Sequence, residues 1–218
     1  MEGLGKVFSM KKIFTADLHH QVLVAWECCR RTVGAALPVL SLDFHTDVLN
    51  CARRGVEFPA EALRAVEVLH HDEHFDWALR AGIISRAVIV ALSPCAVAPE
   101  HPGLTVRRSD LLPDMEKMLN SPEDFRPVAE KVLDDRFLQP LLNDGFPAGK
   151  FILDIDCDYL LCEKALFPEE HTLIDALAQQ AELITLSREN DWVKILKLPG
   201  EKITGTALAE QLISRWEK

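Results

Sequence analysis

Two short stretches of this chain carry the residue types and the spacing of metal ligands. LDFHTD, at 42–47, has an acidic or histidine side chain at every second position, and LDIDCD, at 153–158, repeats the pattern. The residues concerned are Asp43, His45, Asp47, Asp154, Asp156 and Asp158. Alternate side chains on an extended chain point to the same side, so each stretch is predicted to gather its ligands on one face. A lone DxD sequence also occurs at strand ends by chance, and it is the pair of stretches that indicates a site.

The charge of these side chains indicates what they would bind. If the two stretches end neighbouring strands, their backbones lie about 4.8 Å apart and five carboxylates crowd one site. Carboxylates that close cannot all remain ionised without protons or cations to compensate them. Two divalent ions would supply that charge, and the ions of two-metal sites lie about 3.5–4 Å apart, close to the strand spacing. Mixed oxygen and imidazole ligands suit Mn²⁺, Fe²⁺ or Zn²⁺, and the excess of oxygen favours Mn²⁺.

The elements that must position these residues alternate between short apolar, β-branched runs and longer helical patterns. Strands are predicted at 12–16, 38–44, 87–92, 104–108, 150–156 and 183–187. Helices are predicted at 20–32, 60–70, 73–82, 122–143 with a break near Pro140, 171–181 and 205–217. Strands separated by helices form a mostly parallel sheet covered on both faces, so we expect a three-layer α/β fold in a single domain over residues 1–218. In such folds ligands bind at the carboxyl ends of the strands, where both acidic stretches fall.

The composition narrows the partners and the compartment. The chain has 218 residues, 48% of them hydrophobic, and a net charge of −10. An acidic surface argues against nucleic acid or an anionic membrane as a partner. No apolar stretch reaches the roughly 18 residues of a membrane span, and the N-terminal residues lack the apolar core of a signal peptide. The six cysteines are expected to be buried thiols and the four tryptophans to pack in the core, so a cytoplasmic protein is predicted.

A pair of histidines, His19 and His20, falls where the first predicted strand turns into a helix. A helix that starts on the ligand edge can offer one imidazole to a metal, and either histidine could do so. A pair of histidines at a helix start is also common on a protein surface, so the pair indicates a ligand only because the acidic stretches end on the same edge.

With these three pieces in order, the chain resembles the ureohydrolases of the arginase/deacetylase fold. That family has a ligand histidine at the start of a helix, then a DxHxD strand end and a late DxD strand end. The resemblance implies two Mn²⁺ ions held by His20, Asp43, His45, Asp47, Asp156 and Asp158. It also implies that Asp43 and Asp156 bridge the ions and that Asp154 lies behind the ligands. The choice between His19 and His20 stays open.

The closer resemblance is to a small arginase-like family that includes the peptide arginases, which convert arginine side chains of peptides to ornithine and release urea. The blocks HHQVLVAW, LSLDFHTD, DEHFDWALRAGIISRAVIV and LDIDCDYL carry it over roughly residues 15–190. It implies a metal-dependent hydrolase whose substrate is an arginine-containing peptide or a small guanidinium compound. The chain is much shorter than the true arginases and lacks the Asp-Pro after their late DxD, so their substrate loops do not carry over.

Hydrolysis of a guanidinium group needs a proton donor and an acceptor for the positive charge of the substrate. The stretch HHDEHFDWAL supplies several candidates, and we predict His74 as the proton shuttle with Glu73 beside it at the catalytic site. Glu189 follows a predicted strand on the same edge. It is predicted to bind the guanidinium, because planar donors pair best with a carboxylate.

Two other interpretations remain open. A zinc amide hydrolase of the deacetylase type would use one metal and would usually have a histidine where Asp158 stands. A metal-binding module of the same fold would keep the ligands without turnover, because an intact ligand set does not establish a substrate pocket. The sequence leaves a homo-oligomer open under each interpretation.

Overall fold

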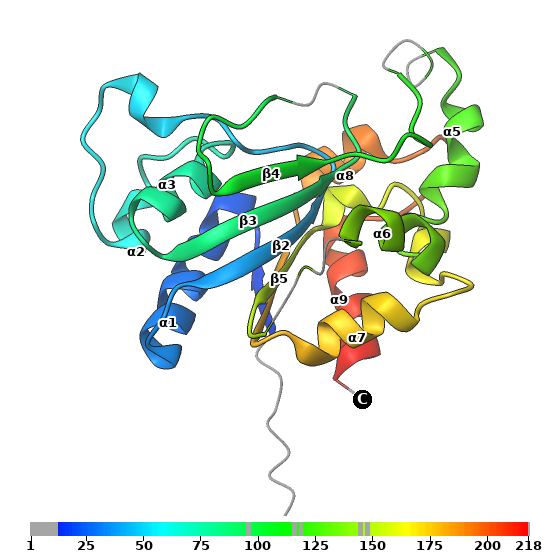
Figure 1. Cartoon of the computed structure of the whole chain (residues 1–218). Coiled ribbons are helices and arrows are strands. Elements are labelled where there is room, and N and C mark those ends of the chain that lie inside the picture. Colours follow the sequence, from blue (N-terminus) through cyan, green and yellow to red (C-terminus); the bar gives the residue numbers. More distant parts are fainter. Residues whose placement is uncertain are drawn as a thin grey trace, which may run out of the picture.

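The computed structural model describes residues 13–94, 97–114, 117, 120–143, 146 and 149–217. Within this part of the chain, six parallel strands form one sheet in the order β1-β6-β5-β2-β3-β4 (Figure 1). The strands are β1 Ile13–Ala16, β2 Leu37–Asp43, β3 Ile84–Ala91, β4 Leu104–Arg107, β5 Ile152–Asp156 and β6 Leu183–Ser187. All the predicted strands are found, which confirms the α/β class and the parallel sheet.

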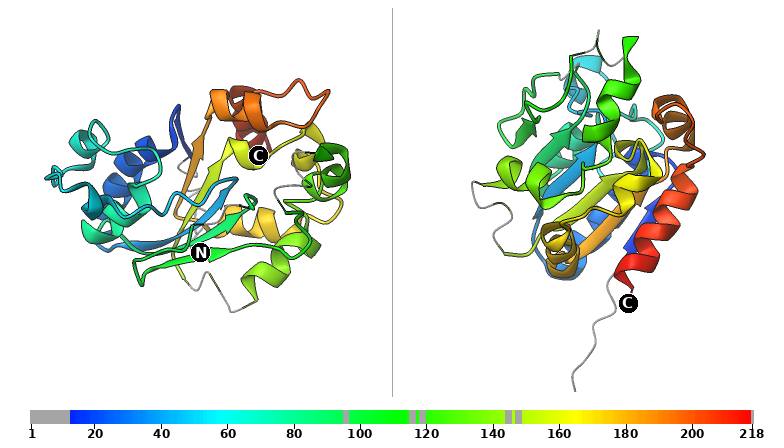
Figure 2. Two further views of the ribbon diagram at one scale, coloured as in Figure 1. Left: turned by 90° about the horizontal axis from the view of Figure 1, so that it is seen from above. Right: turned by 90° about the vertical axis from the view of Figure 1, so that its right-hand side faces the viewer.

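Helices cover both faces of the sheet (Figure 2). The helices on one face are α1 Leu23–Val33, α2 Ala62–Ala65 and α3 His74–Arg80. Those on the other are α5 Pro122–Ala129, α6 Asp135–Leu142, α7 Thr172–Gln180 and α9 Gly205–Trp216. The further elements are α8 Asn190–Leu196 and the 3-10 turns η1 His19–Val22, η2 Cys51–Arg54, η3 Cys157–Tyr159 and η4 Glu163–Leu166.

The alternation along each strand sends apolar side chains into two cores, one on each side of the sheet. On β2, Leu40 and Leu42 join the core under α5, α6, α7 and α9, whereas Val39 joins the core under α1, α2 and α3. Ser41 and Asp43 share the parity of Val39, so they lie on the α1 side of the sheet. The polar residues of β5 follow the same rule, which places both acidic strand ends on one side.

The helices differ from the sequence-based expectation in three places. The predicted helix 122–143 is two helices, and the break lies at Asp134, whose side chain accepts from the Arg136 amide and caps α6. Pro140 lies inside α6 rather than at the break. The helix predicted at 60–70 is limited to α2 and the turns after it, and α8 was not predicted.

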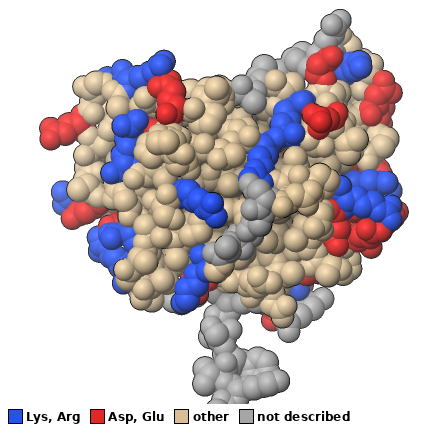
Figure 3. Space-filling model, in the orientation of Figure 1, with Lys and Arg blue, Asp and Glu red and all other residues tan. Residues whose placement is uncertain are grey.

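The helices of the described part of the chain include none that is long and apolar enough to cross a membrane. Figure 3 shows acidic side chains towards the edges of one face, next to basic ones, and further basic side chains across its middle. The negative net charge is therefore not gathered into a single acidic patch on that face.

Candidate metal centre

The two acidic stretches meet at the carboxyl edge of the sheet. β2 and β5 are parallel neighbours, with Ser41 opposite Asp154 in the register. Asp43 and Asp156 therefore end adjacent strands, and both side chains are buried. This adjacency, on which the predicted site depends, is confirmed.

Three overlapping groups of side chains at this edge have the geometry of metal ligands. Within each group, one candidate ligand atom from every residue lies within 4.8 Å of the others. The groups are His19, Asp43 and Asp156; Asp43, His45 and Asp158; and His19, Asp47 and His74. Because Asp43 belongs to two groups, the arrangement suits two ions that share a carboxylate.

The carboxylates are crowded enough to resist ionisation on their own. Burial raises the pKa of Asp43 well above its usual value, and the nearby Asp47 raises it further. Burial and the neighbouring Asp158 raise the pKa of Asp156 in the same way. Asp43 Oδ2 is buried and has no hydrogen-bond partner among the described residues. A buried carboxylate oxygen needs a proton or a cation to offset its desolvation, so this donor set fits a divalent metal.

His19, and not His20, is the histidine that reaches the carboxylates. Its Nδ1 atom lies 3.1 Å from Asp47 Oδ2 and 3.2 Å from Asp156 Oδ2. The chain enters η1 at this residue, and the His19 amide donates to Glu189 Oε1 at 2.6 Å, which fixes the orientation. His20 is only half buried and belongs to none of the three groups. The structure therefore places His19 rather than His20 at the cluster, because the start of the 3-10 turn decides which neighbour faces the sheet edge, and its role as a ligand stays a prediction.

Asp154 lies behind the candidate ligands and orients His19. His19 Nε2 lies 2.8 Å from Asp154 Oδ2, and an ionised carboxylate only accepts, so Nε2 carries the proton and Nδ1 faces the cluster. Ser41 Oγ donates to the same carboxylate at 2.8 Å and Thr185 Oγ1 donates at 2.5 Å. Burial acts to raise the pKa of Asp154, but His19 and the two hydroxyls outweigh it and lower the pKa, so Asp154 stays ionised.

His45, Asp47 and Asp158 reach the cluster from turns and not from extended strands. β2 ends at Asp43, and Asp47 has a positive φ of 47°. Asp158 lies in η3. The expected alternation on an extended chain therefore fails beyond the strand ends, because tight turns bring these side chains back to the edge. His45 Nδ1 lies 3.0 Å from Asp158 Oδ2. Burial lowers the pKa of His45, but this contact outweighs it and raises the pKa to about 9.

His74, the predicted proton shuttle, lies next to His19 and does not line the cavity beside the cluster, and its role in proton transfer stays a prediction. The side chain is fully buried, its ring packs 4.4 Å from that of His19 between centroids, and its Nδ1 atom lies 2.9 Å from the carbonyl oxygen of His71. Burial, with a smaller effect of His19, lowers the pKa of His74 to about 3. His74 is therefore uncharged near neutral pH and has no proton to give at Nε2.

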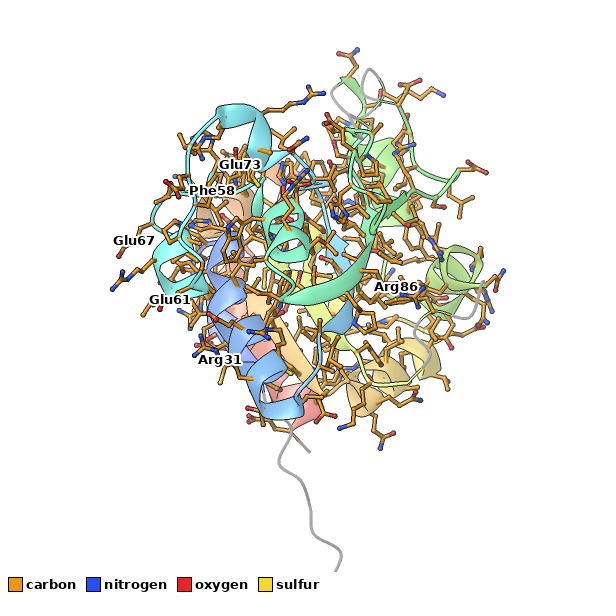
Figure 4. The ribbon with its side chains drawn as sticks, turned by 60° about the vertical axis from the view of Figure 1, so that its left-hand side comes forward. Arg31, Phe58, Glu61, Glu67, Glu73 and Arg86 are labelled. Atoms are coloured by element: carbon orange, nitrogen blue, oxygen red, sulfur yellow. The ribbon has the colours of Figure 1, made fainter. Side chains whose placement is uncertain are left out.

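Glu73 is held in a structural contact at the start of α3 (Figure 4). Its Oε2 atom accepts from Arg54 Nη1 at 2.7 Å and from the His70 amide at 2.9 Å. Glu73 belongs to none of the candidate ligand groups. The prediction of a catalytic role for Glu73 is not supported, because its carboxylate joins the segment before α3 to η2.

Glu189 supports the cluster from the turn between β6 and α8. Its backbone has a positive φ of 37°, its side chain is buried, and its carboxylate accepts the His19 amide described above. Gly205 packs on the same turn, because a Cβ atom there would lie 1.5 Å from the Arg188 carbonyl oxygen. The structure thus ties Glu189 to the backbone of a candidate ligand, and its contact with a guanidinium stays a prediction.

A cavity of about 250 Å³ opens beside the cluster. It is lined by His45, Thr46, Asp47, Val48, Leu49, His71, Asp72, Ser93, Val97 and Trp192. Trp192 packs edge-on against His45, with 4.8 Å between ring centroids, and lies 6.4 Å from His71. Asp72 Oδ1 is buried with no hydrogen-bond partner in the described part of the chain.

The sequence analysis did not predict a place at this cavity for Trp192 or Asp72. Trp192 was expected in the core but is half buried at the cavity, while the other three tryptophans are buried. A sequence signal for its place at the cavity was available, because Trp192 comes three residues after Glu189 and both follow a strand that ends on the ligand edge. Asp72 is among the candidates of the stretch HHDEHFDWAL, but no sequence signal distinguishes it from Glu73.

The sheet and the buried cluster define an arginase-like α/β fold with a candidate divalent-metal site, and a solved structure agrees with that fold. The proclavaminate amidino hydrolase from Streptomyces clavuligerus matches with a TM-score of 0.53 and 13% identity, over 95% of this chain and 63% of that one. An arginase from Medicago truncatula gives a TM-score of 0.45 and 12% identity, over 95% and 58%. This chain thus spans less than two thirds of either structure. No family model and no curated protein matches the sequence.

Proposed function

We propose that this chain is a metal-dependent hydrolase that converts an arginine side chain and water to ornithine and urea, with a peptide as the substrate. The observation that carries the proposal is the pair of ligand groups sharing Asp43, buried at the carboxyl edge of the sheet. The fold that it shares with an amidino hydrolase supports the choice of a C–N bond of a guanidinium group.

The proposed ligands all lie at the ends of β1, β2 and β5. They are His19, Asp43, His45, Asp47, Asp156 and Asp158. Asp43, which is common to two ligand groups, is the proposed bridging residue, and the resemblance adds Asp156 in the same role. Oxygen atoms outnumber nitrogen atoms in this set, which favours Mn²⁺. When bound, two divalent ions supply an activated water at neutral pH and stabilise negative charge that develops in the reaction.

We assign the proton donor to His71 in place of His74. The leaving amine of ornithine must gain a proton, and the donor has to reach the cavity in which the substrate is bound. His71 is exposed and lines the cavity, whereas His74 lies behind His19. Both histidines belong to the stretch from which the sequence predicted the donor.

Asp72 is the proposed acceptor for the guanidinium. It lines the cavity and keeps one buried carboxylate oxygen without a partner among the described residues. A planar cation with several donors would satisfy that oxygen. Glu189 then acts by holding His19, and a direct bond from Glu189 to the substrate remains a prediction that the Glu189→Gln variant tests through its KM.

The lining of the cavity supports a peptide rather than free arginine. Free arginine carries an α-carboxylate, which Arg or Lys side chains would normally bind. Among the described residues that line the cavity, none is Lys or Arg. An arginine inside a peptide has no such carboxylate beside it, so the lining suits that substrate.

The proposal is tested by metal analysis and turnover on the same preparation. Protein purified without chelators is analysed for metal, loaded with Mn²⁺ and given an arginine-containing peptide or free arginine, with urea and ornithine measured by mass spectrometry. We expect about two metal equivalents and urea from the peptide. The Asp43→Asn variant is the control and should lose both.

Other results would point to the alternatives. One zinc equivalent with release of acetate from an acetyl-lysine peptide would indicate the deacetylase-type hydrolase. Two metal equivalents without any turnover would indicate a metal-binding module. No metal uptake after addition of Mn²⁺ would remove the proposed function altogether.

A further inference from the structure

A second cavity lies beside the one at the metal centre, and it is larger and mostly apolar. Its volume is about 440 Å³. It is lined by Phe44, Pro94, Pro122, Phe125, Leu161, Ile195, Leu196, Lys197, Leu198 and Pro199. These residues come from the turn after β2, the segment after β3, α5, the segment after η3, and the end of α8. We call it the apolar cavity.

The two cavities share walls along three separate segments. Phe44 lines the apolar cavity and the next residue, His45, lines the cavity at the cluster. In the same way, Ser93 lines the cavity at the cluster and the next residue, Pro94, lines the apolar cavity. Residues that are adjacent in sequence have Cα atoms about 3.8 Å apart, so these segments form a thin partition. On α8, Trp192 faces one cavity and Ile195, almost one turn later, faces the other.

The size of the cavities indicates that the cluster cavity alone is not the whole binding site. Ligand sites in proteins are usually about 300–1,000 Å³, and the cluster cavity at about 250 Å³ falls below that range. It has room for a side chain but little more. The apolar cavity falls within the range, so a ligand that used both would be of ordinary size.

Large apolar side chains are exposed to solvent at both cavities. Ile195 is 68% exposed, and Leu49 and Val97 at the cluster cavity are 41% and 45% exposed. Apolar residues gathered beside a polar site commonly mark a binding surface. Their continuity with the candidate metal centre favours the substrate as their occupant.

We propose that the apolar cavity binds an apolar side chain of the same peptide whose arginine occupies the cluster cavity. This inference rests on the proposed function. An extended peptide advances about 3.3–3.6 Å per residue, so an apolar residue one or two positions from the arginine can cross the partition. The protein is then selective for arginine followed or preceded by a residue such as leucine or phenylalanine.

The test compares four peptides that differ only beside the arginine. Each is acetylated and amidated and carries Gly on both sides, Leu before, Leu after, or Leu two positions away. We expect kcat/KM for at least one Leu peptide to exceed that of the Gly peptide by roughly tenfold or more, the discrimination that an apolar pocket gives between large and small groups.

A pair of surface variants locates the preference. Ile195→Glu should reduce the preference for Leu to within about threefold, because the charge would be placed against the bound side chain. Leu63→Glu on α2 is the matched control, since Leu63 is 67% exposed and Ile195 is 68% exposed. Turnover of the Gly peptide should be unchanged in Leu63→Glu, and the preference is measured in each variant as the ratio of kcat/KM for the Leu peptide to that for the Gly peptide.

The possible failures are distinguishable. Equal turnover of all four peptides overturns this inference and leaves the proposed function intact. If no peptide is turned over, the proposed function fails, and calorimetric binding of the same peptides to the Mn²⁺-loaded protein decides the inference. Tighter binding of Leu peptides that Ile195→Glu abolishes supports it, and equal binding overturns it. A preference that survives Ile195→Glu, or a dimer in sedimentation that this variant disperses, overturns the assignment of the cavity to a peptide side chain.

Discussion

At the scale of single residues, the candidate site depends on side chains that hold other side chains. His19 faces the cluster with Nδ1 because Asp154 accepts a hydrogen bond from Nε2 and Glu189 accepts one from the backbone amide of His19. Asp154 in turn remains ionised in a buried place because Ser41 and Thr185 donate to it. Without these hydrogen bonds the ligand side chains could rotate, and the affinity for metal would be lower.

The first prediction concerns Asp154→Asn. The amide cannot carry the negative charge that fixes His19, so we expect Mn²⁺ affinity to fall by about 10–100-fold while the protein remains folded. Isothermal calorimetry measures the affinity and circular dichroism the fold. Asp175→Asn, which alters a carboxylate bound by Arg215 and Trp216 far along the chain, is the control for loss of a partly buried acid. An unchanged Mn²⁺ affinity in Asp154→Asn would contradict the proposed role of Asp154 in orienting His19.

The second prediction separates the histidines before α3. His71→Asn should lower kcat by about 100-fold or more without metal loss, since a general acid contributes roughly 10²–10⁴-fold. His70→Asn is the matched control, because His70 is equally exposed but does not line the cavity. Turnover and metal content are measured together. Full turnover in His71→Asn would contradict the assignment of the proton donor to His71.

At the scale of elements, the turns at the ends of β2, β5 and β6 set the geometry of the site. The strands deliver Asp43 and Asp156, and the turns after them deliver the remaining carboxylates. The turn after β6 is the most constrained, because Glu189 has a positive φ and Gly205 packs directly on the neighbouring carbonyl group. A substitution at Gly205 should therefore change the position of Glu189 and the metal affinity of the cluster.

The third prediction is that Gly205→Ala lowers both stability and metal affinity. The added methyl group must displace the Arg188 carbonyl, which should cost about 1–3 kcal/mol of unfolding free energy, as overpacking does elsewhere. The displaced turn moves Glu189, so Mn²⁺ binding should weaken as well. Urea denaturation and calorimetry check the two effects.

A second glycine supplies the control for Gly205→Ala. At Gly82 a Cβ atom would meet nothing within 4 Å, although φ is +65°. Gly82→Ala should therefore cost about 1–2 kcal/mol from backbone strain alone and leave Mn²⁺ affinity unchanged. If both variants lose stability and neither loses affinity, the turn is not coupled to the cluster.

At the scale of the whole molecule, the sheet brings together acids that would repel one another, and proton and metal binding become linked. Burial and neighbouring carboxylates raise the pKa values of Asp43 and Asp156. Burial lowers the pKa of His45, but its contact with Asp158 outweighs burial and the pKa lies at about 9. Each of these groups must give up its proton to bind a cation, so metal uptake releases protons.

The fourth prediction follows from this release of protons. Because protons compete with the metal, Mn²⁺ affinity should rise as the pH rises from 6 to 8.5, by about tenfold per pH unit for each proton displaced. Calorimetry in two buffers of different ionisation enthalpy counts the protons released. Metal affinity that stays constant over this pH range would mean that His45, whose pKa lies at about 9, is not a ligand.

The sequence by itself determined which residues could meet, because the period of the strands and the order of strands and helices are local properties. An apolar β-branched run followed by acids is a strand end, and parallel strands place all such ends on one edge. The class of fold, the strands and the gathering of Asp43 and Asp156 were predictable for that reason.

Only the tertiary structure decided which of two neighbouring residues faces the site. His19 rather than His20 faces the cluster, and His71 rather than His74 lines the cavity, because the short turns that hold these residues set the directions of their side chains. The carboxylate of Glu73 accepts a hydrogen bond from Arg54, and Trp192 lines the cavity and does not pack in the core. These contacts join segments far apart in the chain, so packing alone settles them.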